Sequence, residues 1–294
     1  MLYPLFAGER LALRVAERCG AALGRIETRR FPDGETYLRY ADDPAGRDVV
    51  ILAQLDRPDP KLFPLALALA TARELGARRV GLVAPYLPYL RQDKRFHPGE
   101  AVSAAHALRF LAGGADWLVT VDPHLHRIKD LADVAAIPAT VAHAAPALAA
   151  WIAADVRDPL LIGPDSESAQ WVEEVARDAG APYRVLRKRR LGDRSVTLRL
   201  PSLRGLTGRT PVLVDDIVSS GATMLAAAAR LADLGMAAPV VVAVHALFAR
   251  GAYAALSRVA RAVVTANTVR HRSNRIDVAP ALAAAVNAHL AGDA

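Results

Sequence analysis

The chain has 294 residues, of which 53% are hydrophobic and 23% charged, a composition typical of a globular protein with one large domain or two of ordinary size. The net charge of +7 favours acidic partners such as phosphates or nucleic acid, although general compositional bias explains most of the arginines. The single cysteine, Cys19, excludes an internal disulfide and a cysteine-cluster metal site, and it favours a cytoplasmic, reducing compartment. We expect neither a signal peptide nor a membrane span, because no apolar run reaches roughly 18 residues.

Short apolar runs alternate along the chain with longer segments of helical periodicity. The runs are rich in Val, Ile and Leu and apolar throughout, which predicts strands buried on both faces of a parallel sheet. They are Asp48–Gln54, Arg79–Pro85, Trp117–Asp122, Pro159–Gly163, Pro182–Arg187, Pro211–Asp215, Pro239–His245 and Ala262–Thr265. The helical patterns are Leu62–Leu75, Ala101–Leu111, Glu167–Ala179 and Thr223–Leu234. This alternation predicts an α/β fold.

The recurrence of the strand–helix unit predicts two similar halves. Gly76, Gly180 and Gly235 each follow a periodic segment, and glycine at that position marks a helix end. The stretch 138–146, which contains Ala, His and Pro, is the expected junction. We therefore expect one domain over residues 1–142 and a second over residues 143–276, with a last helix at about 277–291 packing back on the first.

The strongest functional signal is PVLVDDIVSSGATML, residues 211–225. An apolar strand leads into the carboxylates Asp215 and Asp216, and a loop of small residues then opens a helix. The loop residues are Ser219, Ser220, Gly221, Ala222 and Thr223. Such a loop lets backbone N–H groups approach an anion at a helix N-terminus, and carboxylates beside it can accept hydrogen bonds from sugar hydroxyls. The segment predicts a sugar-phosphate site, with a helix cap after an acidic turn as the plainer alternative.

This loop resembles the phosphoribosyl pyrophosphate (PRPP) motif of the phosphoribosyltransferase fold. Other segments resemble ribose-phosphate pyrophosphokinase, also called PRPP synthetase, in that family's order and over nearly the whole chain. They are RFPDGETYLRY (30–40), APYLPYLRQDKRFHPGEAVS (84–103), VDPH (121–124), GPD (163–165), RKRR (187–190) and TANTVRHRSNRIDVA (265–279). The resemblance implies two tandem phosphoribosyltransferase-like domains, each with a mainly parallel sheet flanked by helices.

The resemblance also implies an ATP site. Residues at the positions of Phe31, Asp33 and Glu35 reach ATP that is held largely by a neighbouring subunit in that family; by itself, Pro-Asp-Gly reads as a turn. Arg91 offers a planar guanidinium that can bind phosphates, and Gln92 can form hydrogen bonds with an adenine edge. An exposed polar turn is an equally good interpretation of the tripeptide Arg91-Gln92-Asp93 when it is taken alone.

His124 and Asp165 correspond to residues that help to hold Mg²⁺ on the ATP phosphates in that family. Imidazole is an unusual ligand for Mg²⁺, which prefers oxygen, and a lone histidine is more often structural than a ligand, so Asp165 is the more natural ligand. Asp122 is the alternative ligand, with a cap of its strand as the plainer interpretation.

Lys188 and Arg190 correspond to a mobile basic loop that neutralises charge as the pyrophosphoryl group transfers. Comparable cations are worth about 10³–10⁵ in the rate of phosphoryl transfer. A solvated basic patch is the usual interpretation of such a run when it stands alone.

The implied reaction transfers the β,γ-pyrophosphoryl group of MgATP to the anomeric hydroxyl of ribose 5-phosphate, giving PRPP and AMP for nucleotide biosynthesis. A homo-oligomer, dimer or hexamer, is implied, without nucleic acid or membrane. One alternative is a nucleobase phosphoribosyltransferase, which shares residues 215–223 but has no use for the FPDGE, RQD and KRR segments together. The other is a catalytically silent regulatory paralogue, against which the retained His124, Asp165, Lys188 and Arg190 argue.

Four places depart from the commoner family pattern. They are Phe96, His126-Arg127, Ser166-Glu167-Ser168 and Ser219. These changes bear on regulation by phosphate and ADP more than on the reaction itself.

Overall fold

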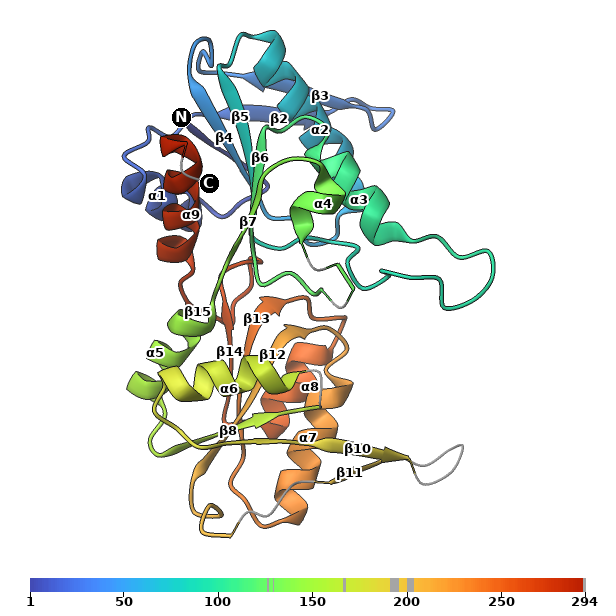
Figure 1. Cartoon of the computed structure of the whole chain (residues 1–294), viewed down its shortest axis with the longest axis vertical. Coiled ribbons are helices and arrows are strands. Elements are labelled where there is room, and N and C mark those ends of the chain that lie inside the picture. Colours follow the sequence, from blue (N-terminus) through green and yellow to red (C-terminus); the bar gives the residue numbers. More distant parts are fainter. Residues whose placement is uncertain (126, 129, 166–167, 191–195, 200–203, 293–294) are drawn as a thin grey trace. The chain divides into compact units, whose positions relative to one another are not determined.

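The computed structural model describes residues 1–125, 127–128, 130–165, 168–190, 196–199 and 204–292. The chain divides into two compact units. Unit 1 comprises Met1–His143, Thr268–Arg270 and the C-terminal segment from Ala279, and unit 2 comprises Ala144–Asn267 and His271–Val278. Each unit has a parallel sheet flanked by helices (Figure 1), which confirms the predicted α/β fold.

The sheet of unit 1 has five parallel strands in the order β1-β4-β5-β6-β7. They are β1 (Leu2–Leu5), β4 (Asp48–Ala53), β5 (Arg79–Ala84), β6 (Trp117–Val121) and β7 (Ala139–Ala142). On one face α1 contacts α9, and on the other α3 contacts both α2 and α4. The helices are α1 (Glu9–Arg18), α2 (Asp59–Glu74), α3 (Ser103–Ala112), α4 (Leu131–Ala135) and α9 (Ala279–Ala291).

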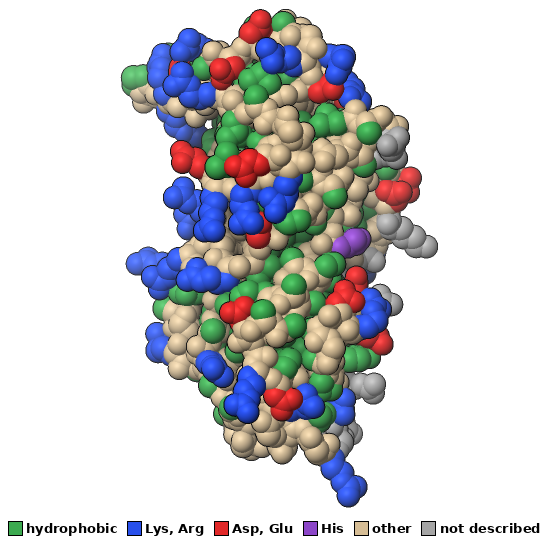
Figure 2. Space-filling model, turned by 90° about the vertical axis from the view of Figure 1, so that its left-hand side faces the viewer, with side chains coloured by type: hydrophobic (Ala, Val, Ile, Leu, Met, Phe, Trp, Pro, Cys, Tyr) green, Lys and Arg blue, Asp and Glu red, His purple; other side chains and the backbone are tan. Residues whose placement is uncertain are grey.

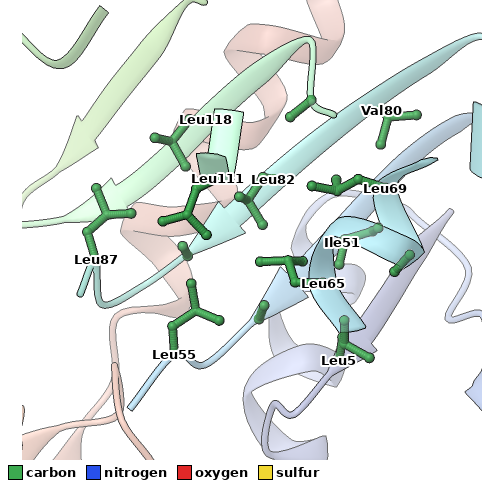
Figure 3. Packing of buried hydrophobic residues seen from close by; sticks show 14 of the residues in the cluster. Leu5, Ile51, Leu55, Leu65, Leu69, Val80, Leu82, Leu87, Leu111 and Leu118 are labelled. Atoms are coloured by element: carbon green, nitrogen blue, oxygen red, sulfur yellow. The ribbon is translucent and has the colours of Figure 1, made fainter. Parts of the chain in front are cut away.

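The core of unit 1 lies between α2, α3 and the sheet. Leu65 and Leu69 of α2 lie beside Ile51 of β4 and Leu82 of β5, and all four are buried (Figure 3). Leu111 of α3 belongs to the same cluster. Burying each such side chain contributes about 1.5–3 kcal/mol, so this cluster fixes the strands whose carboxyl ends carry the candidate residues.

The opposite face of this sheet holds α9 through an aromatic stack and an arginine. The Trp117 ring of β6 stacks on His289 of α9, with ring centroids 4.7 Å apart. A Cβ at Gly81 would lie 2.0 Å from that Trp117 ring, so only glycine fits there. Arg79 donates hydrogen bonds to the carbonyl oxygens of His289 and Leu290, at 3.1 and 2.9 Å, which satisfies the C-terminal end of the helix.

The sheet of unit 2 has six parallel strands in the order β15-β14-β13-β12-β8-β9. They are β8 (Pro159–Gly163), β9 (Tyr183–Val185), β12 (Thr210–Val218), β13 (Val240–Ala246), β14 (Ala262–Ala266) and β15 (Asn274–Ile276). The helices α5 and α6 contact each other, as do α7 and α8. Their bounds are Ala145–Asp155, Ala169–Asp178, Ala222–Asp233 and Ala252–Val259.

Two antiparallel ribbons lie outside these sheets, β2–β3 and β10–β11. Their strands are β2 (Ile26–Arg30), β3 (Thr36–Tyr40), β10 (Arg187–Arg190) and β11 (Val196–Arg199). The charged residues of these strands break the apolar runs that mark the buried strands, so the sequence pattern did not predict either ribbon as such.

The eight predicted strands all occur, and the end of β12 differs most from its predicted position. β12 does not end at Asp215 but continues to Val218, because its backbone keeps pairing with β13 as far as Ala246. Asp215 and Asp216 therefore lie within the strand. Among the described residues, no helix is both long and apolar enough to cross a membrane. In the view of Figure 2, groups of Lys and Arg side chains are scattered among hydrophobic side chains, with Asp and Glu side chains near several of them.

Candidate active site

Two adjacent carboxylates lie near the carboxyl end of β12 in unit 2. The Asp215 carboxylate accepts a hydrogen bond from the backbone N–H of Asp216 at 3.1 Å. The Asp216 carboxylate in turn accepts one from the backbone N–H of Ile217 at 2.7 Å. These bonds orient both side chains against the strand that carries them.

Burial, together with the charges of Asp216 and Asp165, raises the pKa of Asp215 to about 8. Asp165 follows β8, which pairs with β12 in the sheet, so the parallel topology brings its carboxylate to the same edge. Three carboxyl groups thus create a negative local field that favours hydrogen-bond donors or a cation as ligands.

The loop after β12 leads directly into α7. Gly221 stands at the helix N-cap with φ of 74° and accepts a hydrogen bond from the Leu225 N–H at 2.8 Å, which closes the first turn. A Cβ at Gly221 would lie 3.2 Å from Leu256 of α8, so both the conformation and the close approach favour glycine. The Ser219 carbonyl accepts from the Ala249 N–H at 3.0 Å, which ties the loop to the segment after β13.

This loop is open to ligands. Ser220 and Ala222 are exposed, and Ser219 and Thr223 are half-buried. Together with the N-terminus of α7, the segment offers two serine hydroxyls, a threonine hydroxyl and backbone N–H groups in one place. Such an arrangement binds phosphate well, because its donors and the helix dipole both favour negative charge.

The turn after β8 is shaped around Gly163. The Ser168 hydroxyl donates to the Asp165 carbonyl at 2.7 Å and would lie 2.6 Å from a Cβ at Gly163. Ser168, one of the three residues 166–168 that depart from the commoner family pattern, therefore stabilises the turn that carries Asp165 by a side-chain hydrogen bond. Ser166 and Glu167, the other two residues of that departure, lie outside the described part of the chain.

The base of the β10–β11 ribbon lies near this turn, because the Leu186 N–H donates to the Gly163 carbonyl at 2.9 Å. Lys188 pairs with Leu198 and Arg190 with Val196 across the ribbon. The side chains of Lys188 and Arg190 lie outside the described part of the structure, so their roles stay predictions.

In unit 1, Arg91 and Gln92 follow β5. The Gln92 side-chain oxygen accepts from the Ser103 hydroxyl at 3.0 Å, and the Gln92 carbonyl accepts from the Ala104 N–H at 3.2 Å. Both bonds attach this turn to the start of α3, while Arg91 is exposed. The turn is thus fixed at its glutamine and presents its arginine to solvent.

His124 is half-buried in the segment after β6, which pairs with β5. The preceding Asp122 has a φ of 32° and lies 3.0 Å from the His143 ring through its carboxylate. Among the described residues, no three His, Cys, Asp or Glu side chains gather as a metal site. Mg²⁺ commonly takes one or two protein carboxylates and completes its coordination shell with water and phosphate oxygens. The carboxylates of Asp165 and its neighbours Asp215 and Asp216 in unit 2 fit that preference.

Phe31, Asp33 and Glu35 lie at the exposed turn of the β2–β3 ribbon. The Phe31 N–H donates to the Glu35 carbonyl at 2.8 Å, and the Asp33 carboxylate accepts from the Glu35 N–H at 3.1 Å. Sequence reasoning missed Arg29, whose guanidinium lies 4.5 Å from the Phe31 ring centroid and 4.3 Å from that of Tyr37. Arg29 and Phe31 are two positions apart, and such residues lie on the same face of a strand, so their spacing could have predicted this contact.

Known proteins match both halves of the chain. Residues 1–113 match the family model for the N-terminal domain of ribose phosphate pyrophosphokinase, and residues 131–276 match the model for a phosphoribosyl transferase domain. A ribose-phosphate pyrophosphokinase of Methanopyrus kandleri is 36% identical over 282 residues, which cover 95% of this chain and 96% of that one. One of Halobacterium salinarum is 35% identical over 290 residues, covering 97% and 100% respectively.

A solved structure matches the whole chain as well. The crystal structure of phosphoribosylpyrophosphate synthetase from Mycobacterium smegmatis superimposes with a TM-score of 0.85, at 26% sequence identity, over 99% of both chains. The two sheets and their flanking helices are therefore two phosphoribosyltransferase-type domains, as the family resemblance implied.

Proposed function

The chain belongs to the ribose-phosphate pyrophosphokinase family, and we propose that it transfers the β,γ-pyrophosphoryl group of MgATP to the anomeric hydroxyl of ribose 5-phosphate. The products are PRPP and AMP. The observation that carries the proposal is the edge of unit 2 where Asp215 and Asp216 adjoin the open loop at the N-terminus of α7. A nucleobase phosphoribosyltransferase is not favoured, because the N-terminal domain of the pyrophosphokinases is also present.

Ribose 5-phosphate binds with its phosphate on the loop Ser219–Thr223 and its vicinal hydroxyls on Asp215 and Asp216. The N-terminus of α7 favours the phosphate charge, and the carboxylates accept hydrogen bonds from the sugar. The raised pKa of Asp215 means that binding donors or a cation there relieves an unfavourable local field.

ATP binds through Arg91 and Gln92, and through Phe31, Asp33 and Glu35 from a neighbouring subunit of a homo-oligomer. The exposed Phe31 ring suits base stacking, and Arg29 supports it from one side. The anomeric oxygen then attacks the β-phosphorus in line, and the bond between that phosphorus and the α,β-bridging oxygen breaks. AMP leaves with the bridging oxygen, and the hydroxyl proton passes to solvent.

His124 and Asp165 would hold Mg²⁺, with the Asp165 carboxylate the better match to the oxygen preference of the ion. When bound, Mg²⁺ neutralises charge on the phosphate oxygens and makes the phosphorus more electrophilic. Lys188 and Arg190 neutralise the charge that develops during transfer. No protein nucleophile is needed, since positioning and charge stabilisation suffice. We place the enzyme in the cytoplasm.

The test incubates purified protein with Mg²⁺, ATP and ribose 5-phosphate and separates the nucleotides by ion exchange. We expect AMP only when ribose 5-phosphate is present. ADP in place of AMP would refute pyrophosphoryl transfer. An absence of turnover by folded protein that still binds ribose 5-phosphate would favour a silent paralogue.

A further inference from the structure

One ion pair in unit 1 joins two segments that the proposed function assigns to nucleotide binding. The Arg127 Nη1 atom lies 3.1 Å from each carboxylate oxygen of Asp93. Asp93 comes directly after Arg91 and Gln92, and Arg127 comes three residues after His124. The pair therefore connects the turn after β5 with the segment after β6.

The two partners are exposed to very different extents. The Asp93 side chain is only 4% exposed, whereas that of Arg127 is 53% exposed. A carboxylate withdrawn from water is costly unless a cation or hydrogen-bond donors compensate its charge. Arg127 supplies that compensation from the surface. Its contact is thus unlike an ordinary surface pair such as Arg73–Asp116, in which both side chains are well exposed.

The charge of Asp93 also matters for Arg91. Asp93 stands two residues from Arg91, whose guanidinium is assigned to the ATP phosphates. Without Arg127, the carboxylate would compete with the phosphates for nearby cations and would repel a polyphosphate. Gln92 is anchored separately to Ser103 and Ala104, so loss of Arg127 would leave the turn attached to α3 but release its link to the segment after β6.

We infer that Arg127 is a positioning residue for the nucleotide: through Asp93 it fixes the Arg91–Gln92 turn against the segment that carries His124, and it neutralises the buried carboxylate. This inference rests on the proposed function, which assigns those two segments to ATP. Arg127 lies in one of the places where the chain departs from the commoner family pattern, and its ion pair with Asp93 is a structural reason for arginine at this position.

The experiment compares Arg127→Gln, Asp93→Asn, their double variant and Arg73→Gln. The last is a matched control, because Arg73 pairs with Asp116, just before the amino end of β6, whereas Arg127 follows its carboxyl end. Steady-state kinetics give KM for ATP and for ribose 5-phosphate, and calorimetry gives the affinity for α,β-methylene-ATP, which cannot transfer its pyrophosphoryl group.

We expect Arg127→Gln to raise KM for ATP and the Kd for the analogue by about tenfold, while KM for ribose 5-phosphate changes by less than about twofold. The double variant should bind the analogue better than Arg127→Gln does, because Asp93→Asn removes the uncompensated charge. A purely structural role would move both KM values together. Arg73→Gln should match the wild type.

The outcomes separate this inference from the proposed function. Wild-type AMP formation with unchanged analogue binding by Arg127→Gln overturns the inference and leaves the function standing. Analogue binding that weakens in Arg127→Gln supports the inference even if the wild type forms no AMP. If Arg127→Gln does not fold, Asp93→Asn decides: equal effects on both KM values overturn the inference. No analogue binding by the folded wild type overturns both.

Discussion

Asp215 carries a cost to stability that replacement by asparagine should remove. In the folded protein, burial and the charges of Asp216 and Asp165 raise its pKa to about 8, whereas an unfolded chain has an Asp pKa of about 3.9. Between these values the folded state binds more protons, so this group lowers the stability of the fold as pH rises from 4 to 8. Asp215→Asn does not titrate, and its advantage should therefore grow over that range.

The size of the effect follows from the same numbers. A pKa difference of one corresponds to about 1.4 kcal/mol, which gives an upper limit of about 4 kcal/mol at pH 7. The carboxyl is partly exposed, so solvent screening reduces the gain, and we expect about 1–3 kcal/mol, or about 2–10 °C in Tm. Above pH 8, where the Asp215 side chain is ionised, Asp215→Asn should also weaken binding of ribose 5-phosphate, because an amide accepts hydrogen bonds less strongly than a carboxylate.

Thermal unfolding of wild type and Asp215→Asn at several pH values between 5 and 8 measures the first effect, and calorimetry with ribose 5-phosphate measures the second. Asp233→Asn, in the last turn of α7, is the control, because its side chain is 69% exposed and should change stability by less than about 0.5 kcal/mol. A Tm difference between Asp215→Asn and wild type that stays constant across this pH range would refute the reasoning.

Three further predictions concern other sites. Lys188→Ala should lower kcat by orders of magnitude with little change in the Kd for ribose 5-phosphate; an unchanged kcat in the AMP assay would remove its assigned role. Gly221→Ala should lower the free energy of unfolding by about 1–3 kcal/mol in denaturant titrations and weaken sugar-phosphate binding. The reason is that the added methyl group would contact Leu256 and that residue 221 has a positive φ; wild-type stability would contradict this. Arg79→Ala should speed hydrogen exchange in α9 first, because its last carbonyls lose their donor, and unaltered exchange there would count against that anchor.

The buried strands were predictable because their apolar runs have few competing interpretations. The predicted strand ended at Asp215, because carboxylates are rare in buried strands. β12 nevertheless continues to Val218 through backbone pairing with β13. β1 and β15 have four and three residues, too few for a periodicity to be recognised. Backbone pairing decided these cases, because β1 pairs with β4 and β15 with β14, and no local sequence pattern shows these pairings.

Some residues of the candidate site could likewise be identified from the sequence, and others only from the structure. The aspartates and small residues of 215–223 could be identified because they are contiguous and their chemistry is local. The ion pair of Asp93 and Arg127 joins residues 34 positions apart, and it required the folded arrangement of the segments after β5 and β6. The support of Phe31 by Arg29 and Tyr37 likewise depends on the register of the β2–β3 ribbon.

The most direct measurement follows a single phosphorus atom. Purified protein is incubated with ribose 5-phosphate, Mg²⁺ and ATP radiolabelled at the β-phosphate, and the products are separated by ion exchange. Pyrophosphoryl transfer predicts that all transferred label appears in PRPP and that AMP is unlabelled. Label recovered in ADP, with a sugar bisphosphate as the other product, would contradict the proposed reaction.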